Sequence, residues 1–231
     1  GFVVMSDAAW GIREDGASQT GYLVFLVHKD VILKGATGRY VVLDWKSCRT
    51  PRMSRSSLNS EAQAAAAGQD ALEHVLVTWS LAFHPHLDPR DDNTMRLAGP
   101  SALVVDAKSL YDALGREHMG GVTDKRTGIE LMVLKERLAA AGTVKRWQSS
   151  ERQFADGCTK MQARQLLADR LRAGRMQLVH DDTFQSAKKK NATVRAASAQ
   201  EHALARTDKK AVIDDTPPTT TTATAEPPFD S

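Results

Sequence analysis

Hydrophobic positions near the start of the chain follow the patterns of β-strands. Residues 2–5 form a short apolar run, and residues 22–27 (YLVFLV) give the strongest strand signal in the sequence. Residues 40–45 are also rich in β-branched and aromatic side chains, and residues 31–33 are expected to continue the sheet after a turn. Because short polar segments connect these runs, they predict antiparallel neighbours, with residues 22–27 in a central position.

The spacing of apolar residues changes to a helical period after residue 60. Between residues 60 and 83, alanine, leucine, valine and tryptophan recur three and four positions apart. Ser60 and Gln63 have the spacing of a capping box. Ala65 and Gly68 are small, so we expect this helix to approach a sheet closely.

Later segments alternate between strands and helices. Two helical patterns end at glycines, Gly142 and Gly174. The predicted elements are, in chain order, a loop at residues 84–100, a strand at 102–106, a helix at 109–114, a helix at 129–141, a strand at 143–147 and a helix at 154–173. The complete order predicts a mixed α/β fold, in which three antiparallel strands and two further strands form a five-stranded sheet flanked by helices.

Composition divides the chain into a globular part and a polar extension. The 231 residues are 42% hydrophobic and 26% charged. A chain of this length is sufficient for one to two domains with a buried core. We expect a domain at residues 1–174, a polar and partly helical extension at 175–213, and a disordered Thr/Pro-rich tail at 214–231. Because the sequence does not begin with Met, we also expect it to be part of a longer polypeptide.

The same composition narrows the class of protein. No run of about 18 apolar residues is present, which argues against a transmembrane helix. The two cysteines, Cys48 and Cys158, exclude a disulfide scaffold and a four-cysteine zinc site. They are typical of a reducing compartment, so we expect an intracellular protein, either cytoplasmic or nuclear.

Charge is informative only locally. The net charge of +3 is too small to indicate nucleic-acid binding by itself. Residues 46–55, however, contain four cations and no acid, namely Lys46, Arg49, Arg52 and Arg55. Such a segment fits either a solvated surface or a rim that contacts phosphates. Ser18 and Thr20, in the first predicted turn, fit either a substrate contact or a solvated loop.

Four carboxylates lie at the ends of predicted elements. They are Asp7 at the end of the first strand, Glu61 at the start of the long helix, Asp106 at the end of the fourth strand and Asp156 at the opening of the last helix. In an open sheet, strand ends and helix starts are where sites are assembled. Acids gathered there repel one another unless cations lie among them, and Mg²⁺ prefers oxygen ligands. Taken singly, each acid is better explained as a turn, helix-start or helix-cap residue than as a metal ligand, and the spacing alone does not change this.

Four groups of short sequence words surround these acids. They are SDAAW and GASQTGY at residues 6–22, WKSC and SSLNSEA at 45–62, DAKSLYD at 106–112, and WQSS and QFADGCTK at 147–160. In this order and spacing, the words resemble the ribonuclease H domain of copia-type LTR retrotransposon Pol polyproteins. The resemblance covers residues 2–172.

The resemblance implies a ribonuclease H-like fold and an endonuclease that hydrolyses the RNA strand of RNA–DNA hybrids. It implies that two Mg²⁺ ions, for which Mn²⁺ can substitute, are held by Asp7, Glu61, Asp106 and Asp156. The implied partners are an RNA–DNA hybrid and the polymerase domain of the same reverse-transcriptase polyprotein, without a membrane. Ser18, Thr20, Lys46, Arg49, Arg52 and Arg55 then become candidates for nucleic-acid binding.

The sequence departs from this family outside the four acids. No His lies between Thr143 and Asp156, where ribonuclease H domains often carry one that helps product release. Ala107 follows the third acid, where many copia-type domains have Asn, and Gln63 stands where a second Glu is usual. Two alternatives therefore stay open: a decayed or domesticated module that binds nucleic acid without cleaving it, and a ribonuclease H-like nuclease that acts on DNA.

Overall fold

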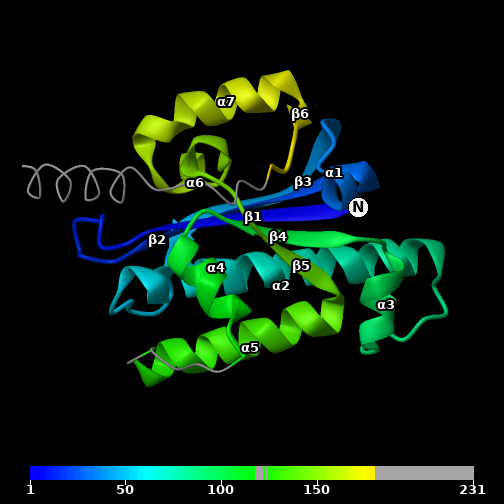
Figure 1. The fold of residues 1–231 in the computed structure, drawn as a ribbon, viewed down its shortest axis with the longest axis horizontal. Helices are drawn as coiled ribbons and strands as arrows, with labels where there is room; N and C mark the ends of the chain where they lie inside the picture. Colours follow the sequence, from blue (N-terminus) through cyan, green and yellow to red (C-terminus); the bar gives the residue numbers. More distant parts are fainter. Residues whose placement is uncertain (118–121, 123, 180–231) are drawn as a thin grey trace, which may run out of the picture. The chain divides into compact units, whose positions relative to one another are not determined.

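A mixed β-sheet organises the part of the chain that the computed structural model describes, residues 1–117, 122 and 124–179 (Figure 1). The predicted tail at 214–231 and nearly all of the predicted extension lie outside these residues. The strands are β1 (Phe2–Ala9), β2 (Gln19–Val27), β3 (Gly38–Arg49), β4 (Ser101–Val105), β5 (Thr143–Trp147) and β6 (Arg175–Met176). Their spatial order is β5-β4-β1-β2-β3-β6.

The predicted fold class is confirmed. Strands β1, β2 and β3 pair antiparallel, whereas β4 pairs parallel to β1 and β5 pairs parallel to β4. The two-residue strand β6, which pairs antiparallel with β3, adds a sixth strand to the five that the sequence predicts.

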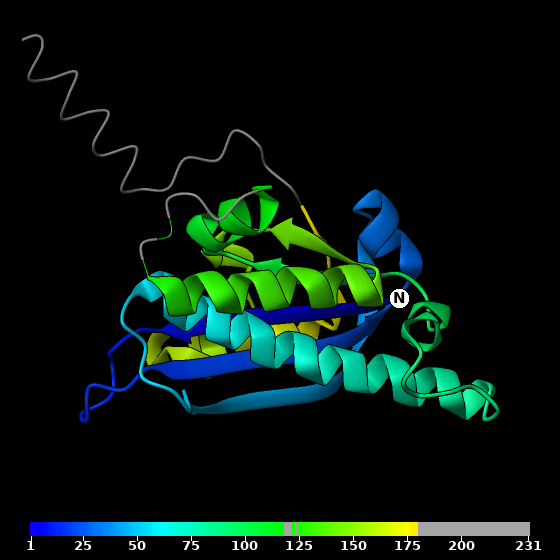
Figure 2. The same ribbon diagram turned by 90° about the horizontal axis from the view of Figure 1, so that it is seen from below.

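Helices cover both faces of the sheet. They are α1 (Lys29–Lys34), α2 (Ser57–Phe83), α3 (Asp92–Leu97), α4 (Lys108–Gly115), α5 (Lys125–Ala141), α6 (Asp156–Thr159) and α7 (Arg164–Ala173), with short 3-10 helices η1 (Ser150–Arg152) and η2 (Met161–Ala163). Figure 2 shows α2 and α5 crossing one face, and Figure 1 shows α6 and α7 on the other. In the described residues, no helix is both long and apolar enough to cross a membrane.

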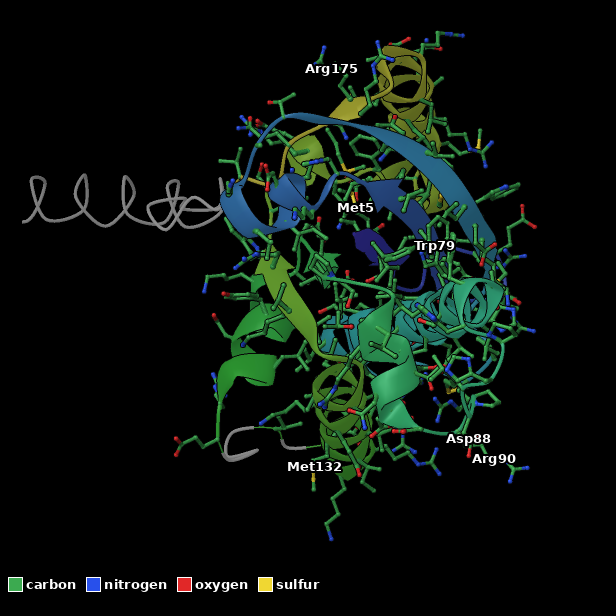
Figure 3. All side chains as sticks on the ribbon, turned by 90° about the vertical axis from the view of Figure 1, so that its right-hand side faces the viewer. Met5, Trp79, Asp88, Arg90, Met132 and Arg175 are labelled. Atoms are coloured by element: carbon green, nitrogen blue, oxygen red, sulfur yellow. The ribbon has the colours of Figure 1, made fainter. Side chains whose placement is uncertain are left out.

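Alternating side chains of β1 build two cores. Phe2 and Val4 pack in the cluster that includes α2 and α5, whereas Val3 and Met5 pack in the cluster that includes Phe154 near α6. All eight residues of β1 are buried, as expected for a central strand that is covered on both faces. Figure 3 shows Met5 inside the molecule and Met132 projecting outward from α5.

Helix α2 lies very close to the sheet, as the small residues predict. A Cβ atom at Gly68 would lie 3.1 Å from Cγ2 of Val4. The capping-box prediction is wrong, because the helix begins at Ser57, about one turn before the expected start. Ser56 is the N-cap, and its side chain accepts a hydrogen bond from the backbone N–H of Asn59.

Three segments differ from the sequence prediction. The run at residues 31–33 is not a strand but part of α1, which the His28 side chain caps and which ends at Gly35 in the left-handed conformation. The helix predicted at residues 154–173 is broken after α6, where Lys160 is extended. Gly157 allows α7 to fold back on α6, since a Cβ there would lie 2.5 Å from Cβ of Leu167. The predicted loop at 84–100 contains the short helix α3.

Candidate metal and nucleic-acid site

Three of the four predicted carboxylates come together at one end of the sheet. Asp7 lies within β1, Asp106 directly follows β4, and Asp156 is the first residue of α6. Because β1 and β4 are parallel neighbours, their carboxyl ends bring Asp7 and Asp106 to the same edge. One carboxylate oxygen from each of the three residues lies within 4.8 Å of the others. We call these three residues the acidic cluster.

Glu61 adjoins the acidic cluster without belonging to its closest group. It lies in the second turn of α2 rather than at the start of the helix, and it accepts a hydrogen bond from the backbone N–H of Ala8. Burial, together with the charges of Asp7 and Asp106, holds the pKa of Glu61 well above its usual value. Glu61 therefore lies close enough to Asp7 and Asp106 to feel their charges, next to the acidic cluster.

Hydroxyl groups orient two of these carboxylates. The Ser150 hydroxyl donates to Oδ2 of Asp106 at 2.6 Å, and the Thr159 hydroxyl donates to Oδ2 of Asp7. The indole N–H of Trp147 donates to the backbone carbonyl of Asp106 at 2.9 Å. These orienting residues were missed as site residues, although the last pair of sequence words contains all of them.

A lysine lies among the acids. Nζ of Lys160 is 2.7 Å from Oδ1 of Asp156 and 3.3 Å from Oδ1 of Asp7. Burial lowers the pKa of Lys160, but the charges of Asp7 and Asp156 outweigh that effect and hold the pKa above its ordinary value. The site thus already accommodates a cation between carboxylate oxygens, which are the donors that Mg²⁺ prefers. The residues present therefore fit a divalent metal ion.

Helix α6 is held on the sheet by close contacts. Gly21 lies opposite Asp7 in the register of β1 and β2, and a Cβ on it would lie 2.5 Å from Cβ of Cys158. The Ser47 hydroxyl donates to the carbonyl of Cys158 at 2.5 Å. Gln153, just before α6, donates to the carbonyl of Ser6 at 3.1 Å. These contacts determine where Asp156 lies relative to Asp7.

The acidic cluster predicts an unusual dependence of stability on pH. Burial and the charge of Asp7 raise the pKa of Asp156 from 3.8 to about 6, and they also raise the pKa of Asp106. Between about pH 4 and pH 6, the carboxyl groups of Asp156 and Asp106 therefore keep protons in the folded state that they have released in the unfolded state. In a chelator, the free energy of unfolding should fall by about 2 kcal/mol as the pH rises from about 4 to about 6.

Denaturant titrations in EDTA at a series of pH values would measure this slope. In Asp156→Asn the fall should be smaller, because this position then has no proton to release. An Asp156→Asn slope equal to that of the unsubstituted protein would show that the carboxyl of Asp156 is not perturbed.

The predicted nucleic-acid-binding residues divide into two sets. Lys46 and Arg49 are exposed on β3, whereas Arg52 and Arg55 lie in the loop that leads into α2. Arg49 pairs with Asp15, and Arg52 pairs with Glu130.

A pocket of about 360 Å³ lies at the start of α2 and contains three arginines. Its lining residues are Arg52, Met53, Arg55, Asn59, Gln63, Asp124, Arg126 and Ile129.

Ser18 and Thr20 lie inside the protein. Both are buried, and the Thr20 hydroxyl is 2.8 Å from the hydroxyl of Thr50. The Ser18 hydroxyl accepts a hydrogen bond from the backbone N–H of Gly11 at 3.3 Å. The Ser18 hydroxyl thus holds the turn between β1 and β2, whereas the Thr20 hydroxyl links β2 to the residue that follows β3. Neither hydroxyl lies on the surface where a nucleic acid would bind.

Comparison with known proteins gives similarity only to solved structures. No protein-family model and no curated protein sequence matches the chain. The N-terminal RNase H domain of a Mycobacterium tuberculosis protein is 16% identical to this chain with a TM-score of 0.42. The match covers 74% of this chain and 97% of the chain in that structure. RNase H1 from Halobacterium salinarum is 13% identical with a TM-score of 0.44, and covers 73% and 98%. LC11-RNase H1, solved in complex with an RNA/DNA hybrid, is 10% identical with a TM-score of 0.46, and covers 70% and 95%.

Proposed function

We propose that this chain is a divalent-metal-dependent endonuclease that hydrolyses the RNA strand of RNA–DNA hybrids. The observation that carries the proposal is the convergence of Asp7, Asp106 and Asp156, with one oxygen of each carboxylate within 4.8 Å of the others. The ammonium group of Lys160 already lies between two of them, Asp7 and Asp156. These residues come from separate parts of the chain, and each belongs to a sequence word that resembles a ribonuclease H motif.

The residues of the site have distinct roles in this proposal. Asp7, Asp106, Asp156 and Glu61 would hold Mg²⁺ or Mn²⁺. Two such ions would supply an activated water molecule and charge stabilisation for the leaving oxygen in phosphodiester hydrolysis. Ser150 and Thr159 orient the carboxylates of Asp106 and Asp7 through the hydrogen bonds described above. Such preorganisation reduces the rearrangement that the reaction requires.

Recognition of the hybrid would depend on its shape and its backbone. The pocket that contains Arg52 and Arg55 lies beside the N-terminal part of α2, the helix that carries Glu61. Arginine side chains there suit phosphate oxygens, and minor-groove shape and 2′-hydroxyl groups distinguish an RNA strand from DNA. Lys46 and Arg49 would extend this surface along β3.

We extend the proposal to the biological context that the sequence words imply. The domain would be the ribonuclease H part of a retrotransposon reverse-transcriptase polyprotein. The polymerase domain of the same polyprotein would be its partner. Removal of the RNA template after reverse transcription would then be its task. The word order supports this context, and the departures at Ala107 and Gln63 leave a module that binds without cleaving as the second candidate.

Cleavage of a labelled RNA–DNA hybrid in the presence of Mg²⁺ tests the proposal. We expect cuts in the RNA strand of the hybrid and none in duplex DNA of the same sequence. Hybrid binding without cleavage, in both Mg²⁺ and Mn²⁺, would support the non-catalytic module. Cleavage of duplex DNA would instead indicate a nuclease that acts on DNA.

The basic pocket gives a prediction for binding. Replacing Arg52 and Arg55 together by alanine should weaken hybrid binding and reduce its salt dependence, with the slope of log K against log[salt] falling by about 0.9 for each lost phosphate contact. Fluorescence anisotropy at several salt concentrations would measure both effects. Arg90→Ala is a matched control, because this exposed arginine (Figure 3) follows the C-terminal end of α2, whereas Arg52 and Arg55 precede its N-terminal end. The helix between them has 27 residues and is about 40 Å long. Equal slopes for the three proteins would rule out phosphate contacts in this pocket.

A further inference from the structure

The ammonium group of Lys160 lies between two members of the acidic cluster, Asp7 and Asp156. It bonds to Oδ1 of both Asp7 and Asp156, and the Thr159 hydroxyl bonds to the second oxygen of Asp7. Both carboxylate oxygens of Asp7 therefore already accept hydrogen bonds, one from Thr159 and the other from the next residue in the chain, Lys160. The side chain of Asp7 is 1% exposed, so water does not compensate its charge.

The backbone directs Lys160 into this place. Lys160 follows the single turn of α6, and its N–H bonds to the carbonyl of Asp156 at 2.8 Å. The chain is then extended at Lys160, with φ −121° and ψ 123°, before η2 begins. The side chain thus reaches back over Asp156, and it is 32% exposed, which leaves a path outward to solvent.

We propose that Lys160 is a displaceable internal cation, which neutralises the acidic cluster in the absence of metal and competes with divalent ions for Asp7 and Asp156. This inference rests on the proposed function, because it concerns the same metal site. Without a cation, the buried acids would repel one another strongly. A lysine that supplies this charge stabilises the metal-free fold, and it lowers the apparent affinity for metal by the same interaction.

Removal of the Lys160 charge should therefore have opposite effects on the stability of the metal-free protein and on its affinity for metal. In Lys160→Met the thermal midpoint in EDTA should fall, because the carboxylates lose their counter-charge. The apparent affinity for Mn²⁺ should rise at least about tenfold, since no ammonium charge competes for the same oxygens. The increase in thermal midpoint on adding Mn²⁺ should therefore be larger in this variant than in the unsubstituted protein.

Isothermal titration calorimetry with Mn²⁺ alone, together with thermal unfolding in EDTA and in Mn²⁺, tests the inference without measuring activity. Lys160→Gln keeps a hydrogen-bond donor without the charge. It replaces Lys160→Met as the test variant if Lys160→Met does not fold in EDTA. Lys160→Arg keeps the charge, and its affinity should stay near that of the unsubstituted protein. Lys34→Met is the matched control, because Lys34 also pairs with an aspartate four residues away, Asp30, on a helix at the other end of the sheet.

The outcomes separate this inference from the proposed function. Tighter Mn²⁺ binding in Lys160→Met and Lys160→Gln, with no change in Lys34→Met, supports the displaceable cation. Equal affinities in all variants overturn it, while RNA cleavage by the unsubstituted protein would leave the proposed function intact. An unsubstituted protein that binds no Mn²⁺ and cleaves no hybrid overturns the proposed function, and the inference with it.

Discussion

Replacing Asp7 by asparagine is expected to lower the rate of hybrid cleavage by at least about a thousandfold, because the central ligand of the proposed two-metal site is lost. Burial and, after it, the charge of Asp7 raise the pKa values of Glu61, Asp106 and Asp156. Removing this charge should also relieve repulsion among the remaining acids. Asp7→Asn also removes one partner of Lys160, so a melting curve in EDTA must show that the variant is folded before its activity is compared.

Single-turnover cleavage of a labelled hybrid, with a melting curve of the same sample, would measure both effects. Asp169→Asn is a suitable control, because Asp169 is an exposed acid on α7 that pairs with Arg172. Its activity should equal that of the unsubstituted protein. A folded Asp7→Asn protein that still cleaves hybrid in Mg²⁺ at the rate of the unsubstituted protein would refute the nuclease proposal.

A methyl group at Gly21 is expected to destabilise the domain and weaken metal binding together. The added Cβ in Gly21→Ala would meet Cβ of Cys158 at 2.5 Å and Cγ2 of Thr159 at 2.9 Å, so α6 must move away from β2. Such overpacking costs about 2–3 kcal/mol, or a fall of about 5–10 °C in the melting temperature. Because α6 carries Asp156 and leads into Lys160, the displacement should also reduce Mn²⁺ affinity.

Melting curves and Mn²⁺ titrations would measure the two consequences. Gly128→Ala is the matched control, because a Cβ at Gly128 meets no atom within 4 Å and the residue lies in α5. Alanine there should stabilise the domain by about 0.5–1 kcal/mol, since glycine is unfavourable in a helix. A Gly21→Ala protein that is as stable as the unsubstituted protein would show that α6 is not tightly seated on β2.

Local sequence signals predicted much of the fold. The strand at residues 143–147 has the expected bounds, and Gly142 ends α5 in the left-handed conformation that glycine adopts readily. Gly174 ends α7 in the same way. These signals are local, because a cap or a helix end depends on neighbouring residues. Residues 31–33 misled the prediction, since periodicity in so short an apolar run cannot distinguish a strand from a helix.

Contacts between distant segments explain the remaining errors. Helical propensity runs continuously through residues 154–173, but the packing of Gly157 against Leu167 requires the chain to turn between α6 and α7. Ser18 and Thr20 have the polarity of a solvated loop, yet the pairing of β2 with β3 places Thr20 against Thr50 in the interior. Polarity alone does not report whether a hydroxyl finds its partner inside the protein.

The sequence by itself determined which four acids are candidates and the order of the words around them. Only the tertiary structure decided that Lys160, 153 positions after Asp7, lies between two of the acids, and that hydroxyl groups of Ser150 and Thr159 orient them. The reason is physical: electrostatic interactions and hydrogen bonds depend on distances of a few ångströms. Across so long a separation, those distances follow from strand order and from the close seating of α6 on β2.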